Sequence, residues 1–483
     1  MPHCIFIRLT LFVFGALPGL AVWAGEAKCP NVIYVFTDQQ HAGMMSCTGN
    51  PHLQTPAMDS LARTGVRFER AYSANPVCVP SRVAMLTGHF PSRFGMQSNG
   101  ELGTTKIPDS VLQQSLGSLF RSAGYRTVYG GKTHVPGKIE QYGFEVLTGD
   151  QRQTLADSCV QFLQQKHEQP FLLVASFINP HDICYMAIND FERAGGSGLK
   201  GKAKKAAKKD SPTAPHQVAL AAALQRPAGL SDEEFLAQLP PLPANLEPPQ
   251  GEPDILAGAS HGTGFRAHAF ANWGERQWRL HRWAYCRLTE LVDREIGQVL
   301  QTLRDTGLED NTLVVFSSDH GDHDGAHRLE HKSTFYEEAA RVPFIVSYKG
   351  VTKPGLVDRT HVVSSGLDLI PTLCDFAGIA VPPDLPGRSV RALAEGRDPG
   401  VWRPFVVSET HYGRMVCSGR FKYCVYESGE RHESLVDLVA DPGEMQNLAA
   451  APEHASVLQQ HRDCLRQWLD GYGDQFATEY AVR

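Results

Sequence analysis

The segment Asn75-Pro-Val-Cys-Val-Pro-Ser-Arg-Val-Ala-Met-Leu-Thr-Gly88 carries the strongest structural signal in this 483-residue sequence. It predicts a helix that begins close to a cysteine. Pro80 suits the first helical turn, Ser81 suits the capping position, and Gly88 is typical of a residue that ends a helix. The chain on either side of this segment is interpreted as the scaffold that holds it.

A reactive group at Cys78 would benefit from this position. A helix N-terminus presents unpaired N–H groups and the positive end of the helix dipole, so an oxyanion above Cys78 would be favoured there. Arg82, one turn further on, would add a second positive element. An unpaired cysteine is more often a small buried apolar residue, so the other chemical groups of a site must be found elsewhere in the chain.

The length and the net charge of the chain limit its possible domain organisation and partners. The chain contains 42% hydrophobic residues and is too long for one domain of about 100 to 200 residues, so we expect a large domain over 30–400 and a small one over 401–483. The formal net charge is −6, and no global basic field suggests a nucleic-acid partner.

Residues 1–24 are typical of a secretory signal peptide. Arg8 is followed by an apolar stretch from Leu9 to Trp23 with small residues near its end, which predicts a secreted or periplasmic protein; the alternative is an uncleaved anchor. No later segment is apolar enough over sufficient length for a membrane helix. The eleven cysteines include no Cys-x-x-Cys pair of the kind that binds metals, and their disulfide connectivity cannot be read from the sequence.

Two apolar runs end in acidic turns. Asn31–Thr37 precedes Asp38, and Asn311–Ser318 precedes Asp319; both runs are typical of buried strands. The amphipathic segment Gln277–Leu303 predicts a long helix before the second strand. Because ligands bind beyond the carboxyl ends of strands in open α/β sheets, this order is expected to bring the two aspartates to one sheet edge.

Histidines follow two further predicted strands. Tyr125–Tyr129 leads into a loop with Lys132 and His134, which would point the same way if that segment is extended. Pro170–Phe177 leads to His181. Taken alone, each of these residues is more often an ordinary polar loop residue. Together the strands and helices predict an α/β fold with a large mixed, mostly parallel sheet flanked by helices.

The composition changes in two places. Residues 191–274 are Gly- and Lys-rich and then Pro-rich, which predicts an insertion at the rim of the active face. Its lysines could bind a sulfated polymer, but a solvated mobile loop is the more common reading: Lys200, Lys202, Lys204, Lys205, Lys208 and Lys209. Beyond residue 400, the runs Met415–Tyr426 and Glu433–Leu438 predict a small antiparallel sheet, and His454–Leu469 predicts a closing helix.

These elements resemble a known family. Cys78-Val-Pro-Ser-Arg82 and Leu86-Thr-Gly88 are similar to the signature of formylglycine-dependent (type I) sulfatases, which belong to the alkaline-phosphatase-like superfamily. The Lys132-Thr-His134 run resembles the family's Gly-Lys-x-His element, and His181 matches its Pro-His element. Lys332, upstream of Tyr-Glu-Glu and Arg-Val-Pro, fits its second sulfate-binding lysine. Six elements occur in the family's order over residues 30–470.

The resemblance implies two additions to the chain. An activating enzyme would convert Cys78 to 3-oxoalanine (formylglycine), whose hydrated form is the nucleophile. A divalent cation, calcium in this family, would be held by Asp38, Gln39, Asp319, His320 and the modified Cys78. The chain departs from the commoner pattern twice, with Gln39 in place of a second carboxylate and His320 where asparagine is common.

The resemblance also implies catalytic roles. Lys132, Lys332 and Arg82 would neutralise the sulfate. His181 would protonate the leaving oxygen, and His134 would act as the base that regenerates the aldehyde. Candidate substrate contacts are polar residues in nearby loops: His323, Asp324, His327, Arg328 and His411.

The function that follows is hydrolysis of sulfate esters, with a sulfated polysaccharide or glycosaminoglycan fragment as the expected substrate. A phosphonate or phosphodiester hydrolase with the same site is one alternative. A non-catalytic protein that binds sulfated glycans is another, and Gln39 is the residue that favours it. Choline sulfate and small aryl sulfates also remain candidate substrates, and a sulfatase-maturating enzyme is the expected partner.

Overall fold

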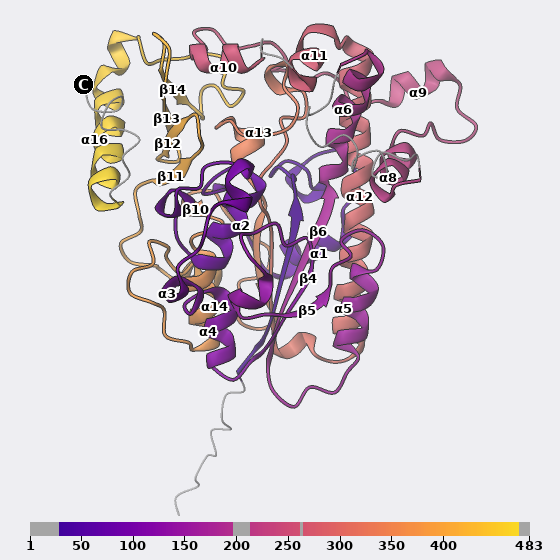
Figure 1. Cartoon of the computed structure of the whole chain (residues 1–483), viewed down its shortest axis with the longest axis vertical. Helices are drawn as coiled ribbons and strands as arrows, with labels where there is room; N and C mark the ends of the chain where they lie inside the picture. Colours follow the sequence, from indigo (N-terminus) through magenta and orange to yellow (C-terminus); the bar gives the residue numbers. More distant parts are fainter. Residues whose placement is uncertain (1–28, 197–212, 261–263, 473–483) are drawn as a thin grey trace, which may run out of the picture.

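The computed structural model describes residues 29–196, 213–260 and 264–472. A large sheet with helices on both faces forms the body of the molecule, and a smaller antiparallel sheet lies beside its upper end (Figure 1). The predicted α/β fold class is therefore confirmed. The predicted signal peptide at 1–24 and the lysine run of the insertion lie outside the described residues.

The large sheet has eight strands in the order β5-β4-β6-β1-β7-β8-β2-β9. The neighbours from β5 through β7 pair in parallel, whereas β8 is antiparallel to both β7 and β2. In sheet order the strands are β5 (Glu145–Thr148), β4 (Arg126–Gly131), β6 (Phe171–Pro180), β1 (Asn31–Asp38), β7 (Thr312–Ser318), β8 (Phe344–Tyr348), β2 (Val66–Phe68) and β9 (Leu356–Asp358).

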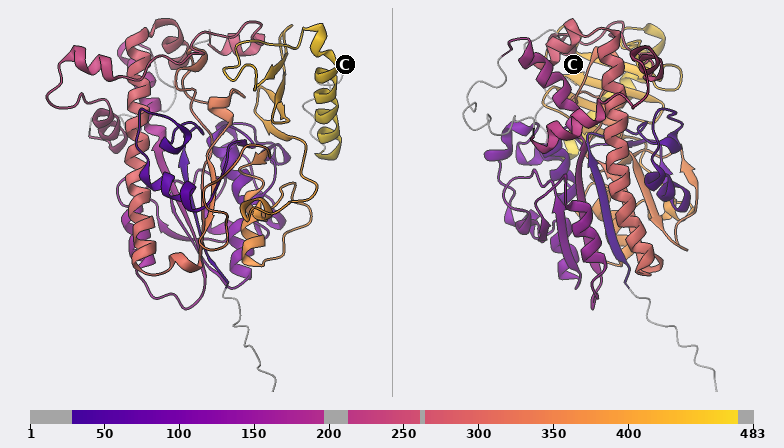
Figure 2. Two further views of the ribbon diagram at one scale, coloured as in Figure 1. Left: turned by 180° about the vertical axis from the view of Figure 1, so that it is seen from behind. Right: turned by 90° about the vertical axis from the view of Figure 1, so that its right-hand side faces the viewer.

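Helices cover both faces because the central strands are apolar on both sides. In β1, Val32 and Tyr34 face one core, and Ile33 and Val35 face the other. The first core contains α2 (Cys78–Thr87), α4 (Leu116–Ser122) and α14 (Leu369–Ala377). The second contains α1 (Pro56–Thr64), α5 (Leu155–Leu163) and the long α12 (Glu275–Asp305), which runs along the whole sheet (Figure 2).

The parallel pairing of β1 with β7 fixes the position of the site. Thr37 lies opposite Ser318, so Asp38 and Asp319 follow at the same sheet edge, as the order of elements predicted. On the other side of β1, β6 reaches the same level, with Asp38 opposite Pro180. Three strand ends therefore supply side chains to one place.

Residues beyond β6 build a helical layer over this edge. It consists of α6 (Cys184–Arg193), α8 (Pro215–Ala223), α9 (Asp232–Gln238), α10 (Asp254–Ser260) and α11 (Phe265–Asn272), which gather at the top of the molecule (Figure 1). The described part of the 191–274 region thus contains several helices joined by irregular segments.

The C-terminal part forms the predicted antiparallel sheet and closing helix. Its strands are β11 (Val406–Glu409), β12 (Gly413–Cys417), β13 (Phe421–Tyr426) and β14 (Glu433–Asp437), and α16 (Ala455–Tyr472) packs against them. Buried Lys422 joins this sheet to the segment between β7 and β8: its Nζ donates to the Phe335 carbonyl oxygen at 2.7 Å and to Glu337 at 3.0 Å. The shorter elements are β3 (Ala71–Tyr72), β10 (Val363–Ser364), α3 (Asp109–Leu112), α13 (Glu337–Ala340) and α15 (Arg391–Ala394).

Two further observations concern the cysteines and the possibility of a membrane-spanning helix. Every cysteine from Cys29 to Cys464 is a free thiol. Within the described ranges, no helix combines the length and apolar character that crossing a bilayer requires.

Candidate active site

Helix α2 begins at Cys78, as the sequence indicated, but its start is stabilised differently. Val77 occupies the N-cap position without a side-chain bond, and the Val79 N–H donates to Asn99 Oδ1 at 2.9 Å. The prediction that Ser81 caps the helix is wrong. Because the helix starts three residues earlier, the Ser81 hydroxyl is free to donate to the Asp319 carbonyl oxygen at 2.6 Å. Gly88 ends the helix at φ 72°, as predicted.

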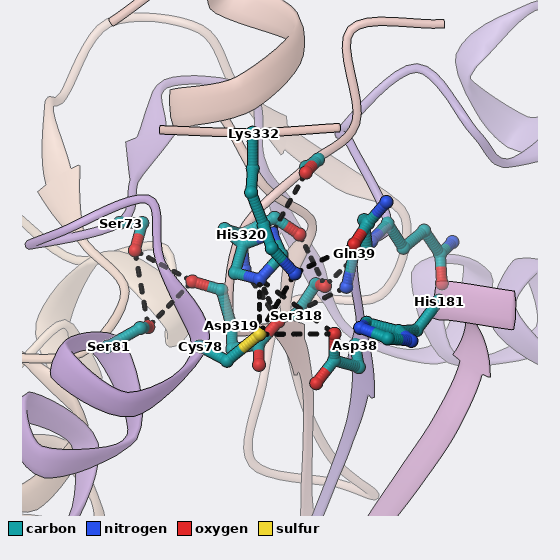
Figure 3. A network of polar contacts seen from close by, with 12 residues as sticks. Asp38, Gln39, Ser73, Cys78, Ser81, His181, Ser318, Asp319, His320 and Lys332 are labelled. Carbon is teal, nitrogen blue, oxygen red and sulfur yellow. Dashed lines mark hydrogen bonds and ion pairs between the residues drawn. The ribbon is translucent and has the colours of Figure 1, made fainter. Parts of the chain in front are cut away.

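Four buried side chains converge above this helix start (Figure 3). Asp38, Cys78, Asp319 and His320 each offer one donor atom, and these atoms lie within 4.8 Å of one another. Cys78 Sγ is 3.1 Å from His320 Nε2 and 3.7 Å from Asp38 Oδ1. The Nδ1 of His320 is 2.9 Å from the Gly321 carbonyl oxygen, so Nδ1 carries a proton and Nε2 is the ring nitrogen that faces the cluster.

Arg82 holds the two aspartates in place. Its Nη2 donates to Asp38 Oδ2 at 2.8 Å and its Nε donates to Asp319 Oδ2 at 2.9 Å. Its Nη1 donates to Ser176 Oγ at 2.8 Å and to the Lys132 carbonyl oxygen at 2.7 Å. The guanidinium is 1% exposed, so these bonds form away from water. Arg82 therefore fixes the outer carboxylate oxygens and leaves the inner ones facing the cluster.

Two lysines also contact members of this cluster. Lys132 Nζ is 2.5 Å from Asp38 Oδ2, and Lys332 Nζ donates to Cys78 Sγ at 3.0 Å. Burial alone would raise the pKa of the Cys78 thiol, but Lys132, Lys332 and His320 hold that pKa well below its usual value. The surroundings of Cys78 therefore favour a negative charge.

The charges also set the state of neighbouring groups. Burial and Cys78 would raise the pKa of Asp38, yet Lys132, His181 and Arg82 hold it well below the usual range. Burial and the nearby Asp38 raise the pKa of Asp319 to about 6. Burial, reinforced by Lys132, lowers the pKa of His181 to about 4, so this imidazole is neutral at pH 7.

A cavity of about 910 Å³ opens beside the lysine and histidine side of the cluster. Lys132, His134 and His181 line it, together with Tyr185 and His216 from the helical layer. The expectation that Lys132 and His134 share an extended segment is wrong. Strand β4 ends at Gly131 with φ 92°, and His134 itself has φ 47°, so the chain turns here. Both residues nevertheless line this cavity.

Comparison with known proteins identifies the family of the chain. A family model described as Sulfatase matches residues 30–379, and one described as N-sulphoglucosamine sulphohydrolase, C-terminal, matches residues 325–470. The chain belongs to the sulfatase family. This confirms the resemblance found in the sequence, and sulfuric ester hydrolysis is the family's class of activity.

Individual sulfatases agree with this assignment. The Δ4,5-hexuronate-2-O-sulfatase of Bacteroides thetaiotaomicron is 31% identical, over 96% of this chain and 93% of its own length. The N-acetylglucosamine-6-O-sulfatase of the same organism is 27% identical, over 94% of this chain and 88% of its own. The crystal structure of a putative sulfatase from that organism is 29% identical and superposes with a TM-score of 0.78, covering 93% of this chain and 94% of the other.

The residues predicted to contact substrate lie outside the cavity lining and bond to other parts of this sulfatase. Each has a protein partner: His323 Nε2 is 2.8 Å from Thr334 Oγ1, Asp324 pairs with Arg282 at 3.3 Å, His327 stacks on Tyr336 at 3.9 Å, Arg328 pairs with Glu247 at 3.4 Å, and His411 packs on Tyr412 at 3.7 Å. Their role as substrate contacts stays a prediction.

Sequence reasoning missed some residues that the fold brings to this candidate site. Arg152 forms a two-pronged ion pair with Asp182, next to His181, at 2.9 and 2.6 Å. Asp322 accepts a hydrogen bond from Gln39. The only sequence signal for Asp322 was its place in the acidic turn after β7. Arg152 follows a four-residue strand and carried no local signal.

Proposed function

We propose that this sulfatase hydrolyses sulfate esters on a carbohydrate, with Cys78 matured to formylglycine and calcium bound beside it. The observation that carries the proposal is the enclosure of Cys78. Two carboxylates and an imidazole lie around it, one ammonium group pairs with the Asp38 carboxylate, and a second ammonium group contacts Cys78 itself. This combination suits the hydrolysis of an anionic sulfate ester, because a nucleophile can attack the sulfur while nearby positive charges stabilise the sulfate oxygens.

The donor set fits a divalent cation. Asp38 and Asp319 present inner carboxylate oxygens, His320 presents Nε2, and the Gln39 amide oxygen lies 2.8 Å from Lys332 Nζ at the edge of the cluster. Calcium prefers oxygen ligands, and the soft sulfur of Cys78 would be replaced by oxygen on maturation. Formylglycine would supply the nucleophilic hydroxyl, and calcium would supply positive charge next to the sulfate oxygens.

The protein's own cations would bind and orient the sulfate. Lys132 lines the cavity and lies against Asp38, whereas Lys332 is 5% exposed and lies against Cys78. Sulfate oxygens between these two ammonium groups would put the sulfur next to residue 78. Arg82 would act through the carboxylates that it holds, because its guanidinium donates to four protein acceptors.

His181 would protonate the leaving oxygen. With no substrate bound, burial and Lys132 keep its pKa at about 4. A sulfate anion between Lys132 and His181 would offset the lysine charge and raise that pKa, so the proton would be taken up as the substrate binds. His134, in the same cavity wall, would accept the proton lost when sulfate is released.

The relatives suggest which sulfated carbohydrate to test first. The sulfatase at 31% identity acts on Δ4,5-hexuronate 2-O-sulfates, and the one at 27% acts on N-acetylglucosamine 6-O-sulfate. The cavity of about 910 Å³ has room for a monosaccharide or disaccharide. We therefore place sulfated uronate and hexosamine units of glycosaminoglycans first.

The remaining parts of the proposal concern maturation and location. Export through the signal at 1–24 to the periplasm or the medium would precede action on an external glycan, and a maturating enzyme would act on Cys78. Residues 30–400 would form the catalytic domain and 401–483 the C-terminal subdomain. N-terminal sequencing of protein recovered from its own host tests the cleavage.

The decisive experiment has two steps. Mass spectrometry of the tryptic peptide Ala71–Arg82, from protein co-expressed with a maturating enzyme, should show an aldehyde in place of the Cys78 thiol. Sulfate release from unsaturated uronate 2-O-sulfate disaccharides, glucosamine 6-sulfates and a phosphonate monoester should then favour a sulfated sugar, with Cys78→Ala inactive. A thiol under all conditions would support glycan binding without turnover, and faster phosphonate cleavage would support the phosphonate hydrolase.

A further inference from the structure

A buried carboxylate outside the metal cluster holds one of its members. Asp322, two residues beyond His320, accepts a hydrogen bond from Gln39 Nε2 at 2.6 Å. Both side chains are fully buried. The other end of the same amide, Gln39 Oε1, accepts from Lys332 Nζ at 2.8 Å, and that ammonium also contacts Cys78. Gln39 lies beside Lys332 above Cys78 in Figure 3.

The two partners leave the amide one orientation. A lysine ammonium only donates hydrogen bonds, so it must meet the amide oxygen. An ionised carboxylate only accepts, so it must meet the amide NH₂. The ammonium of Lys332 and the carboxylate of Asp322 therefore require the same orientation of the Gln39 amide. The oxygen, which is the atom that can serve a cation, is turned toward Cys78.

Asp322 is itself rigidly held. Its Oδ1 accepts from the Asp324 N–H at 2.8 Å, and its Oδ2 accepts from the His331 N–H at 3.1 Å as well as from Gln39. Both N–H groups belong to the loop that carries Lys332. This carboxylate thus joins the first acidic turn, after β1, to that loop.

The same contact excludes an acidic side chain at position 39. A glutamate there would put a second carboxylate against Asp322 at hydrogen-bond distance, with both groups buried and no proton or cation between them. The chain therefore has one negative charge in this pair, on the outer residue, and a neutral oxygen donor on the inner one.

We propose that Asp322 is a positioning residue that fixes the amide oxygen of Gln39 toward Cys78 and the cation cluster, and that its carboxylate is the reason position 39 is neutral. The cation role rests on the proposed function, whereas the pairing of the two residues does not. Asp322→Asn should therefore release the Gln39 amide, while Gln39→Glu should require Asp322→Asn to be tolerated.

A double-mutant cycle tests the pairing on the thiol form of the protein, prepared without a maturating enzyme and kept in a calcium chelator. Asp322→Asn should lower the unfolding midpoint of the wild-type protein and raise that of the Gln39→Glu variant, because the new asparagine amide could donate to the new glutamate. Asp324→Asn is the matched control: this buried acid of the same turn pairs with Arg282 and not with residue 39, so its effect should be the same in both backgrounds.

Calcium titration by calorimetry tests the role toward the cluster, on the same variants after co-expression with a maturating enzyme and removal of the chelator. Asp322→Asn should weaken calcium binding by about tenfold, and the Gln39→Glu/Asp322→Asn double variant should restore or exceed wild-type affinity. If Asp322→Asn does not fold alone, recovery of folding in the double variant supports the pairing.

Additive stability effects, or a double variant less stable than both single variants, would overturn the pairing. Unchanged calcium affinity in folded Asp322→Asn would overturn its role toward the cluster. If wild-type protein binds no calcium, that role falls together with the proposed metal, while the stability cycle still decides the pairing. Neither measurement depends on sulfatase activity.

Discussion

Replacing Arg82 with methionine should be among the most destabilising single changes in this protein. The side chain is 1% exposed and donates to four acceptors, two of which are carboxylates at 2.8 and 2.9 Å. Methionine keeps much of the length but removes the charge, which leaves Asp38 and Asp319 buried together without this partner. Lysine keeps the charge and can reach only part of the fork of acceptors.

The magnitude follows from these contacts. Breaking a buried ion pair by removing one partner costs about 3 to 5 kcal/mol, and Arg82→Met should fall in or above that range. Arg82→Lys should cost about 1 to 3 kcal/mol for the acceptors left without a donor. Lys132 Nζ, 2.5 Å from Asp38 Oδ2, would still pair with one of the two carboxylates and so limits the loss of stability.

Urea unfolding in a calcium chelator, followed by tryptophan fluorescence, measures the loss. Arg466→Met is the matched control, because its pair with Asp463 at 2.8 Å is exposed on α16 and should cost less than about 1 kcal/mol. A loss for Arg82→Met no larger than that of the control would refute the reasoning. So would an equal loss for the methionine and lysine variants, because the charge would then contribute nothing.

Three further changes have expected outcomes. Gly131→Ala should lower the melting temperature and cut activity, because its φ is 92° and a Cβ would lie 2.1 Å from a β6 carbonyl oxygen; Gly124→Ala, at φ 87° with open space around it, is the control and should cost only about 1 kcal/mol. Burial lowers the pKa of His89 to about 4, so the unfolded chain binds a proton at this residue at a higher pH than the folded protein does. The free energy of unfolding should therefore fall as the pH falls from about 6.5 to about 4. In unfolding measurements across that range, His89→Asn should reduce the fall. Calcium should raise the melting temperature of wild-type protein and not of Asp319→Asn; an equal shift in both would contradict the proposed metal site.

Much of the scaffold was predictable because its signals are local. The continuous apolar runs of β1 and β7, with the amphipathic α12 between them, predicted parallel strands ending at Asp38 and Asp319, and the structure confirms that arrangement. The helix at Cys78 was also predicted. Its cap was not: Asn99, rather than Ser81, accepts from the helix start, because a cap supplied from 20 residues away leaves no local pattern.

By itself, the sequence determined the family, the elements of the large sheet and the residues that its motifs mark around Cys78. Periodicity and short motifs are sufficient for these because each depends on neighbours within a few residues. Only the tertiary structure decided which polar groups meet. Asp322 contacts Gln39 across 283 residues, and Arg82 joins two strand ends because the sheet order puts β1 beside β7. Such contacts depend on the register in which the strands pair and on which polar side chains are buried together. No short stretch of sequence contains both partners.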